Sequence, residues 1–276
     1  MNKQLHEAKR ISLTGDRQNN QDRSIVLESG STTLLAVADG LGGHPKGEVA
    51  AQLFIDTCEH MLRRAEQPIR DPRRFMYECI QRAHHAIINF GDRQTPPICP
   101  RSTAVMAIVQ YGKAWWAHVG DSRLYLIRES SILVQTHDHS LVHSIDQPPT
   151  TGKSRSAITR SLGGLDQPPE ISFGIPMSLQ EGDTLLLCTD GLWNQVPQDD
   201  LISLLSEQDL GAGLQRAGHV AASRPRSDNI TAIALRWGPP PGRPAERATA
   251  GRVSDPLEET ISELREVLTR GSTTSP

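Results

Sequence analysis

The pattern of apolar and polar positions changes its period several times along the chain, which predicts a mixture of strands and helices. Between residues 7 and 38, the short apolar runs SIVLE and TTLLAVA are separated by the turn-like ESGS, so they predict strands. From about Gly47 to Glu66, and again after Pro72, apolar residues recur at helical spacing, and Asp71 can cap the second helix. This part of the chain therefore predicts strands followed by a pair of helices.

The pattern after Ser102 predicts further strands and a second pair of helices. The apolar runs STAVMAIVQ, KAWWAHV, SRLYLIR and ILVQTH follow one another at hairpin distances, with turn signals between them. Another strand is predicted at DTLLLCT, helices at 197–209 and near 212–223, and a last strand at NITAIALRW. Short turns between neighbouring strands indicate antiparallel hairpins rather than repeated βαβ units, so the predicted fold class is α+β.

A change of composition after Trp237 predicts a domain boundary. The segment GPPPGRPAERATAGRVSDP is rich in Pro, Gly and Arg and is typical of a linker. Beyond it, one helical stripe carries the apolar residues Leu257, Ile261, Leu264 and Leu268. We expect one domain over residues 1–237, and a linker with a short amphipathic tail helix over 238–276. This helix either docks on the domain or binds a partner, and the pattern favours neither.

Composition narrows the classes of protein that fit. The 276 residues are 37% hydrophobic, enough for one large domain or two small ones, and the net charge of −3 gives no basic excess for nucleic acid. The start of the chain has no apolar segment typical of a secretory signal, and no run of about 18 apolar residues predicts a membrane span. The four cysteines have no metal-site spacing, so we expect reduced thiols in a cytoplasmic protein.

Two apolar runs far apart in the sequence both end in Asp-Gly-Leu, at Asp39 and Asp190. Further aspartates lie at predicted strand boundaries, namely Asp22, Asp121 and Asp228. Carboxylates without a His or Cys pattern suit Mg²⁺ or Mn²⁺ rather than zinc, and Arg17 nearby could supply a fork for a phosphate. Asp-Gly and Asp-Asn are also common turn dipeptides, and spacing alone does not bring these side chains together.

Taken in order, these segments resemble the metal-dependent serine/threonine protein phosphatases of type 2C in their compact bacterial form. The resemblance covers roughly residues 7–237, and a series of ordered blocks makes it far more specific than one Asp-Gly pair. The matching blocks are Arg17 to Asp22, Val37 to Ala50, Ser102 to Ala104, Val119 to Arg123, Asp138 to Val142, Ile158 to Gly163, Cys188 to Trp193 and Ser227 to Thr231.

The resemblance implies a fold, an activity and a cofactor. The fold is a four-layer α-β-β-α sandwich, with two antiparallel sheets flanked by helical pairs. The activity is hydrolysis of phosphoserine and phosphothreonine in proteins, opposing a serine/threonine kinase. Two Mn²⁺ or Mg²⁺ ions, with a weaker third, would activate the attacking water, so that no Cys or Ser nucleophile is needed.

The family pattern also implies a set of metal ligands. Asp39 should bridge two ions, and the carbonyl of Gly40 should bind one of them. Asp190 and Asp228 should hold the other ion. Asp121 matches the residue that helps to bind the weaker third ion in bacterial relatives.

Two further positions complete the implied site, and one departs from some relatives. Asp22 should act near the metal pair, largely through water, and Arg17 should bind the phosphate, so Arg17, Asp22 and Asp39 are the candidate catalytic residues. Some relatives carry a His directly after the Asp-Gly corner, where this chain has Leu41. His44 could be a general acid or a surface residue, and metal-bound water could protonate the leaving oxygen instead.

The largest departure from the family is the segment HSIDQPPTTGKSRSA, where relatives usually have a flap with a short helix. We expect a shortened or mobile flap, and Lys153 and Arg155 could contact a phosphopeptide or lie in a solvated loop. A weakly active or inactive regulatory module of the same fold is the alternative function. A hydrolase for small phosphate esters is disfavoured, because neither a basic surface nor a nucleotide loop is evident.

Overall fold

The computed structural model describes residues 6–139, 160–164 and 167–238. The chain divides into two compact units, Met1–Pro241 and Gly242–Pro276, and the described residues all belong to the first. Lys153, Arg155, the expected flap and the expected tail helix lie outside the described residues. None of the described helices is both long and apolar enough to cross a membrane.

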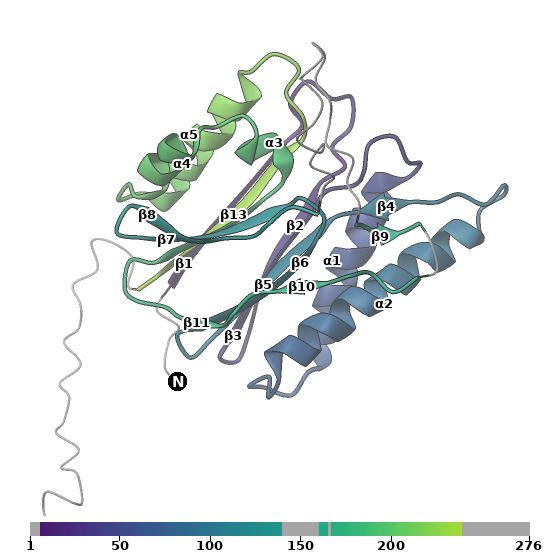
Figure 1. Cartoon of the computed structure of the whole chain (residues 1–276), viewed down its shortest axis with the longest axis horizontal. Helices are drawn as coiled ribbons and strands as arrows, with labels where there is room; N and C mark the ends of the chain where they lie inside the picture. The colour runs from purple at the N-terminus through teal and green to yellow at the C-terminus, as the bar shows by residue number, and fades with distance from the viewer. Residues whose placement is uncertain (1–5, 140–159, 165–166, 239–276) are drawn as a thin grey trace, which may run out of the picture. The chain divides into compact units, whose positions relative to one another are not determined.

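Antiparallel strands of the first unit form two large sheets (Figure 1). One sheet has the order β1 (His6–Leu13), β13 (Ile230–Trp237), β12 (Thr184–Cys188), β7 (Arg123–Arg128) and β8 (Ser131–Gln135). The other has the order β10 (Ser172–Phe173), β6 (Lys113–Val119), β5 (Ala104–Gln110), β3 (Thr32–Ala38) and β2 (Arg23–Ser29), with β11 (Met177–Ser178) also pairing with β6. A separate two-stranded ladder joins β4 (Arg101–Ser102) to β9 (Leu162–Gly163).

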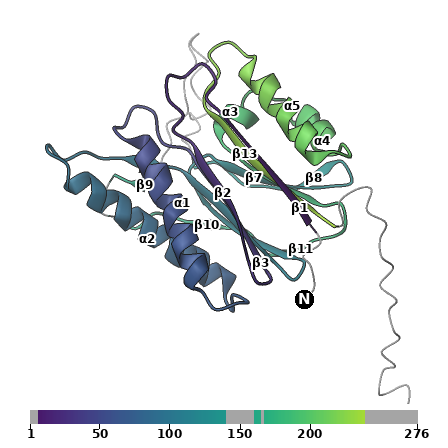
Figure 2. The same cartoon turned by 180° about the vertical axis from the view of Figure 1, so that it is seen from behind.

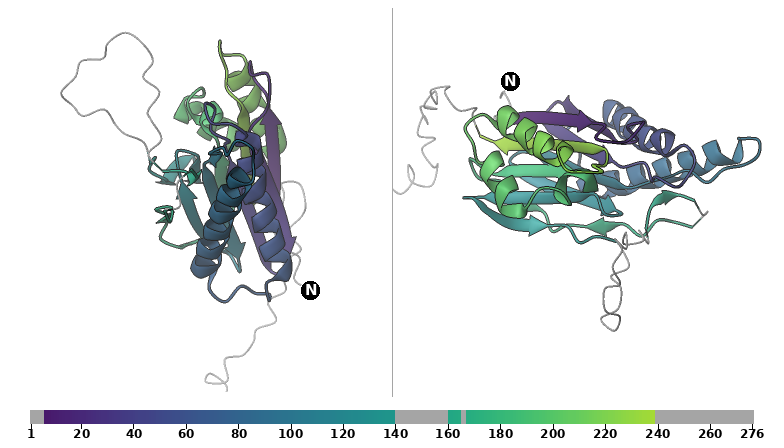
Figure 3. Two further views of the ribbon diagram at one scale, coloured as in Figure 1. Left: turned by 90° about the vertical axis from the view of Figure 1, so that its right-hand side faces the viewer. Right: turned by 90° about the horizontal axis from the view of Figure 1, so that it is seen from above.

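Helices pack against each sheet. The long helices α1 (Gly47–Arg64) and α2 (Pro72–Asp92) share one hydrophobic cluster with β3 and β5. The helices α3 (Asp190–Trp193), α4 (Gln198–Leu205) and α5 (Leu210–Ala222) share another cluster with β12 and β13. Seen from behind and from above, the pair α1 and α2 lies apart from the pair α4 and α5 (Figures 2 and 3).

A third hydrophobic cluster joins the two sheets. On β3, Leu35 and Val37 belong to this cluster, while Leu34 and Ala36 belong to the cluster with α1 and α2. The alternation follows from the period of two in a strand, and every residue of β3 is buried because both faces are covered. This explains why β3 is a continuous apolar run rather than an alternating one.

The structure confirms most of the elements that the pattern predicted. Asp71 caps α2 by accepting a hydrogen bond from the backbone N–H of Arg74 at 3.0 Å, and Pro72 is the first helical residue. Trp116 packs between the sheets, whereas Trp115 packs toward the helical cluster. One expectation needs correction: Asp190 does not end a strand but begins the short helix α3, two residues after β12.

Candidate active site

Strand register places the five candidate aspartates near one another. Arg23 pairs with Ala38, so Asp22 and Asp39 stand just beyond the ends of neighbouring strands. In the other sheet Cys188 pairs with both Arg123 and Ala232, so the segments with Asp121, Asp190 and Asp228 leave three adjacent strands at the same end. Segments that are far apart in the sequence therefore reach a common edge of the two sheets.

Asp39 is fixed through its backbone by the start of β5. Its N–H donates to the hydroxyl of Thr103 at 2.9 Å, and its carbonyl accepts from the N–H of Thr103 at 2.8 Å and from the hydroxyl of Ser102 at 2.9 Å. The hydroxyl of Thr103 also bonds to that of Ser122 at 2.7 Å, next to Asp121. Thr103 therefore connects the corner that holds Asp39 with the loop that holds Asp121.

Gly40 is required by the close approach of the chain behind this corner. A side chain at Gly40 would place a Cβ 2.4 Å from the backbone of Gly47, where α1 begins, and 2.9 Å from the carbonyl of Gln21. No side chain fits at such distances. Gly40 therefore lets the start of α1 and the segment before Asp22 pack directly against the corner.

Asp22 is the most deeply buried of the candidate carboxylates, at 2% exposed. Its Oδ2 accepts a hydrogen bond from the hydroxyl of Thr189 at 2.9 Å, while its Oδ1 has no hydrogen-bond partner among the described residues. Burial raises the pKa of Asp22 to about 7, and the charges of Asp190 and Asp228 add to the rise against the hydroxyl hydrogen bonds.

Arg17 forms a two-pronged ion pair with Asp228. Its Nε donates to Oδ1 at 2.7 Å and its Nη2 to Oδ2 at 2.6 Å. This hydrogen bonding, with the negative charges of Asp228, Asp190 and Asp39, raises the pKa of Arg17 against the opposing effect of burial. The guanidinium therefore lies among the candidate aspartates, where a phosphate would need it.

The loop that carries Arg17 is held by Asn229. The amide nitrogen of Asn229 donates to the carbonyls of Thr14 and Asn19 at 2.9 and 3.0 Å, and its oxygen accepts from the N–H of Gln21 at 2.8 Å. The side chain of Asn229 thus bonds backbone groups of this loop that have no partner in a strand. These bonds fix the loop, and with it Arg17, relative to β13.

Asp121 has an environment similar to that of Asp22. Its Oδ1 is buried and lacks a hydrogen-bond partner within the described part of the chain. Burial raises the pKa of Asp121 to about 7, and the charge of Asp190 is the next cause. For Asp39, burial and then the charges of the four other candidate aspartates hold the pKa well above its ordinary value.

These observations test whether a metal fits. The clustered, buried carboxylates raise one another's pKa because their negative charges are not fully neutralised. A hard divalent cation, which prefers oxygen ligands, would neutralise them. The Oδ1 atoms of Asp22 and Asp121 are buried without a hydrogen-bond partner among the described residues, which points to the same conclusion. Within residues 6–139, 160–164 and 167–238, however, no three His, Cys, Asp or Glu side chains are close enough to form a metal cluster. The candidate aspartates therefore suit a divalent cation in chemistry and charge, but their side chains are not arranged as a complete set of metal ligands.

Comparison with known proteins identifies the family. The family model described as protein phosphatase 2C matches residues 12–212. The chain belongs to the protein phosphatase 2C family. The resemblance inferred from the sequence motifs is thereby confirmed.

Relatives of this type 2C phosphatase include a serine/threonine phosphatase, stp, of Listeria monocytogenes, which is 28% identical over 240 residues, covering 83% of this chain and 94% of the relative. A solved structure of the Streptococcus agalactiae serine/threonine phosphatase has a TM-score of 0.75 and 26% identity, covering 84% of this chain and all of that one. The catalytic domain of PstP, solved with two manganese ions, has a TM-score of 0.70 and 27% identity, covering 84% of this chain and 98% of that one.

Several residues of the candidate site were not singled out by sequence reasoning. Thr103, Thr189 and Asn229 form the hydrogen bonds that hold the aspartates and Arg17, although each lies within a matched motif. Trp193, three residues after Asp190, donates from Nε1 to the carbonyl of Asp121 at 3.0 Å. Thr189 and Asn229 stand next to an Asp in their motifs, which could have pointed to them, whereas the block that contains Thr103 has no Asp. Polar side chains in turns have many other roles, so this signal alone is weak.

Within the described part of the chain, the ring of His44 forms no hydrogen bond that would define its role. Burial and then the positive charge of Arg101 lower its pKa, which favours the neutral imidazole. A neutral ring is a poor proton donor, so this environment does not favour the general acid that the sequence left open.

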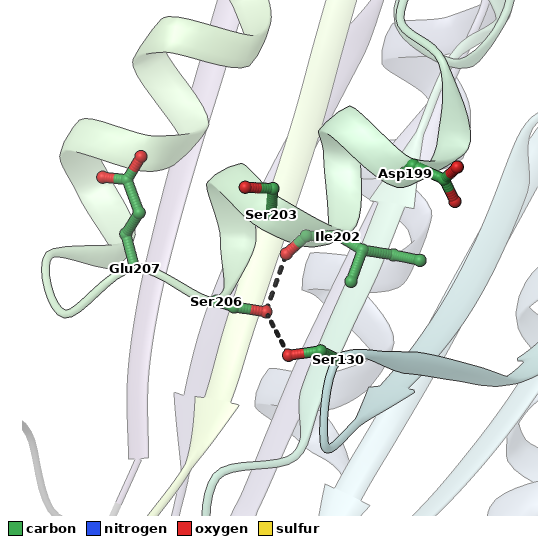
Figure 4. A pocket seen from close by; sticks show the side chains of 6 residues that line it. All are labelled: Ser130, Asp199, Ile202, Ser203, Ser206 and Glu207. Carbon is green, nitrogen blue, oxygen red and sulfur yellow. Dashed lines mark hydrogen bonds between the residues drawn. The ribbon is translucent and has the colours of Figure 1, made fainter.

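A surface hollow of about 450 Å³ lies at the opposite end of β7 from Asp121. It is lined by Ser130, Asp199, Ile202, Ser203, Ser206 and Glu207 (Figure 4). Ser130 lies two residues after the end of β7, whereas Asp121 lies two residues before its start, so the length of the strand separates the two places. The hollow is therefore not part of the phosphatase site.

Proposed function

We propose that this type 2C phosphatase hydrolyses phosphoserine and phosphothreonine in proteins, with divalent cations held by its aspartates. The observation that carries the proposal is the cluster of Asp22, Asp39, Asp121 and Asp190 around the Arg17–Asp228 pair at one edge of the two sheets. Negative side chains would repel a phosphate on their own, so cations are needed before the substrate can bind. The phosphatases among the relatives, including the manganese complex of PstP, support this reading.

The proposed ligands are those that the family pattern implies. Asp39 and the carbonyl of Gly40 would hold one Mn²⁺ or Mg²⁺, Asp39 with Asp190 and Asp228 a second, and Asp121 a weaker third. When bound, these ions supply positive charge and activate a water molecule for attack on phosphorus. Unpaired carboxylate oxygens and raised carboxylate pKa values support the assignment.

The chain's own groups bind and orient the phosphoryl group. Arg17 presents two N–H donors that at present hold both oxygens of Asp228. If Asp228 turns toward a cation, the same fork becomes available to two phosphate oxygens, where it offsets their charge. The pKa of Asp22 is raised to about 7, and positive charge entering the site would lower it and favour the ionised carboxylate. Asp22 would then accept a hydrogen bond from a water at Oδ1.

We also infer a wider setting for this activity. The three hydrophobic clusters support the order α-β-β-α for the layers, with residues 1–237 as the catalytic domain and 238–276 as a separate tail. A cytoplasmic location, a phosphoprotein substrate and a cognate serine/threonine kinase remain predictions. Retention of every aspartate in the family pattern speaks against the inactive regulatory module.

The test is hydrolysis of a phosphothreonine peptide by the purified chain in Mn²⁺, in Mg²⁺ and after addition of EDTA. We expect metal-dependent turnover that EDTA removes. Asp39→Asn should lower kcat at least 100-fold, because the charge shared by the two ions is lost, on the order expected for a lost electrostatic contact. Asp56→Asn, on the exposed side of α1, is the matched control and should retain full activity.

Turnover that survives EDTA, or an Asp39→Asn variant as active as the control, would contradict the metal assignment. A folded wild-type chain that binds Mn²⁺ but hydrolyses no phosphopeptide would shift the function to the regulatory module.

A further inference from the structure

An aromatic side chain links two of the proposed metal-binding segments. Trp193 is the last residue of α3, and Asp190 is the first, so both belong to the same helical turn. The indole Nε1–H donates to the backbone carbonyl of Asp121 at 3.0 Å. This hydrogen bond ties the turn that carries Asp190 to the loop that carries Asp121.

Without a cation the two carboxylates repel each other. After burial, the charge of Asp190 is the largest cause that raises the pKa of Asp121. The Oδ1 of Asp121 is buried, with no hydrogen-bond partner in the described part of the chain. The indole bond therefore holds together two segments that their charges would drive apart, and it leaves a carboxylate oxygen available.

Trp193 is itself held in place from its ring face. The guanidinium carbon of Arg123 lies 3.4 Å from the centroid of the Trp193 ring. Arg123 in turn donates to both oxygens of Asp138 at 2.8 Å and to the hydroxyl of Tyr125 at 3.1 Å. Arg123 and Asp138 are less than one-fifth exposed, so solvent weakens this ion pair less than an open surface pair.

The charges of Arg123 and Asp138 indicate that this pair positions Trp193 rather than neutralising Asp121. Both oxygens of Asp138 are bound by Arg123, so the positive charge of Arg123 is largely compensated by Asp138 rather than by Asp121. The planar guanidinium can bind a carboxylate at its edge and an aromatic ring at its face at the same time. Arg123 and Asp138 thus support Trp193 and leave the negative charge of Asp121 for a cation.

We propose that Trp193, held by the Arg123–Asp138 pair, is a positioning residue that sets the place of Asp121 relative to the turn of Asp190 and thereby the affinity for the weaker third cation at Asp121. This proposal rests on the proposed function, since it concerns the same site. It predicts that the indole N–H, and not only the bulk of the ring, controls metal affinity.

The test is Trp193→Phe, which removes the N–H donor and keeps an aromatic ring for Arg123. Calorimetric titration with Mn²⁺ should show the weakest binding event weakened about 10-fold, with tighter events and the urea midpoint of unfolding nearly unchanged. The Mn²⁺ concentration for half-maximal turnover should rise by a similar factor, while KM for the phosphopeptide stays the same. Trp115→Phe on β6 is the matched control and should leave all Mn²⁺ binding unchanged.

Mn²⁺ binding by Trp193→Phe that equals wild type in every event would overturn the proposal. An equal loss in all events, together with a lower urea midpoint, would also overturn it, because Trp193 would then only stabilise the fold. Calorimetry reports on metal binding without substrate, so the result stands even if the wild-type chain hydrolyses no phosphopeptide.

Discussion

At the scale of single residues, the burial of Asp22 costs stability, and the proposed function explains why the carboxylate is buried. A carboxylate that is 2% exposed, with one oxygen unpaired among the described residues, is an unfavourable feature for stability alone. Its hydroxyl partner Thr189 compensates only one oxygen. The Oδ1 that lacks a partner among the described residues could accept a hydrogen bond from a water, and a nearby cation would stabilise the charge of the carboxylate.

Asp22→Asn should therefore change how stability depends on pH in metal-free protein. The pKa of Asp22 is raised from 3.8 to about 7 in the folded chain, so the folded state binds a proton more tightly than the unfolded state between those values. The contribution of Asp22 to the free energy of unfolding is thus lost as pH rises from about 4 to about 7 and stays constant above. We expect the wild type to lose stability relative to Asp22→Asn across this window in urea titrations with EDTA.

Adding Mn²⁺ should shrink the pH-dependent difference, because the cation stabilises the ionised carboxylate of the wild type. A difference in unfolding free energy that is constant from pH 4 to pH 8 would show that Asp22 does not titrate in this range.

At the scale of elements, the aspartates depend on hydrogen bonds between strands of different hairpins. Thr103 stands between β4 and β5, and it holds Asp39, after β3, and Ser122, before β7. Its side chain is buried, so loss of the hydroxyl removes the partner of the Asp39 N–H and of the buried hydroxyl of Ser122.

Thr103→Val keeps the shape of the side chain and removes the hydroxyl. We expect the free energy of unfolding to fall by about 1–3 kcal/mol, the usual cost of unsatisfied buried polar groups, and kcat to fall with it as Asp39 shifts. Thr57→Val on α1 is the matched control, since its hydroxyl bonds only within the helix to Leu53, and it should cost much less. Both are measured by urea unfolding and phosphopeptide turnover, and equal losses in the two variants would contradict the role of Thr103.

The same scale shows what the sequence could and could not predict. Long apolar runs and helical periods gave α1, α2 and the strands of both sheets, because each has enough residues to express its period. Helix α3 and the ladder of β4 with β9 have four and two residues per element, too few for any period. The proximity of Asp22 to Asp39 depends on the register of β2 with β3, which spacing alone did not predict. The family resemblance implied only that Asp22 acts near the metal pair.

At the scale of the whole molecule, the described residues contain both large sheets, all helices of the clusters and every proposed metal ligand. Strand β13 ends at Trp237, whose N–H donates to the carbonyl of Asp183 at 2.8 Å and whose carbonyl accepts from Gly182 at 2.8 Å. The ring of Trp237 also packs against the cluster between the sheets. The last strand is thus anchored up to its final residue by groups within the first unit.

Deletion of residues 239–276 should therefore leave the catalytic domain active. We expect kcat/KM for a small phosphate ester within about twofold of the full chain, and the same Mn²⁺ dependence, because both large sheets and every proposed metal ligand lie before residue 239. The measurement compares full-length and truncated protein on this ester and on a phosphoprotein. A large loss on the ester would show that the tail belongs to the domain, whereas a loss on the phosphoprotein alone would assign the tail to partner binding. The two substrates thus separate the docking and partner hypotheses that the apolar stripe of the tail left open.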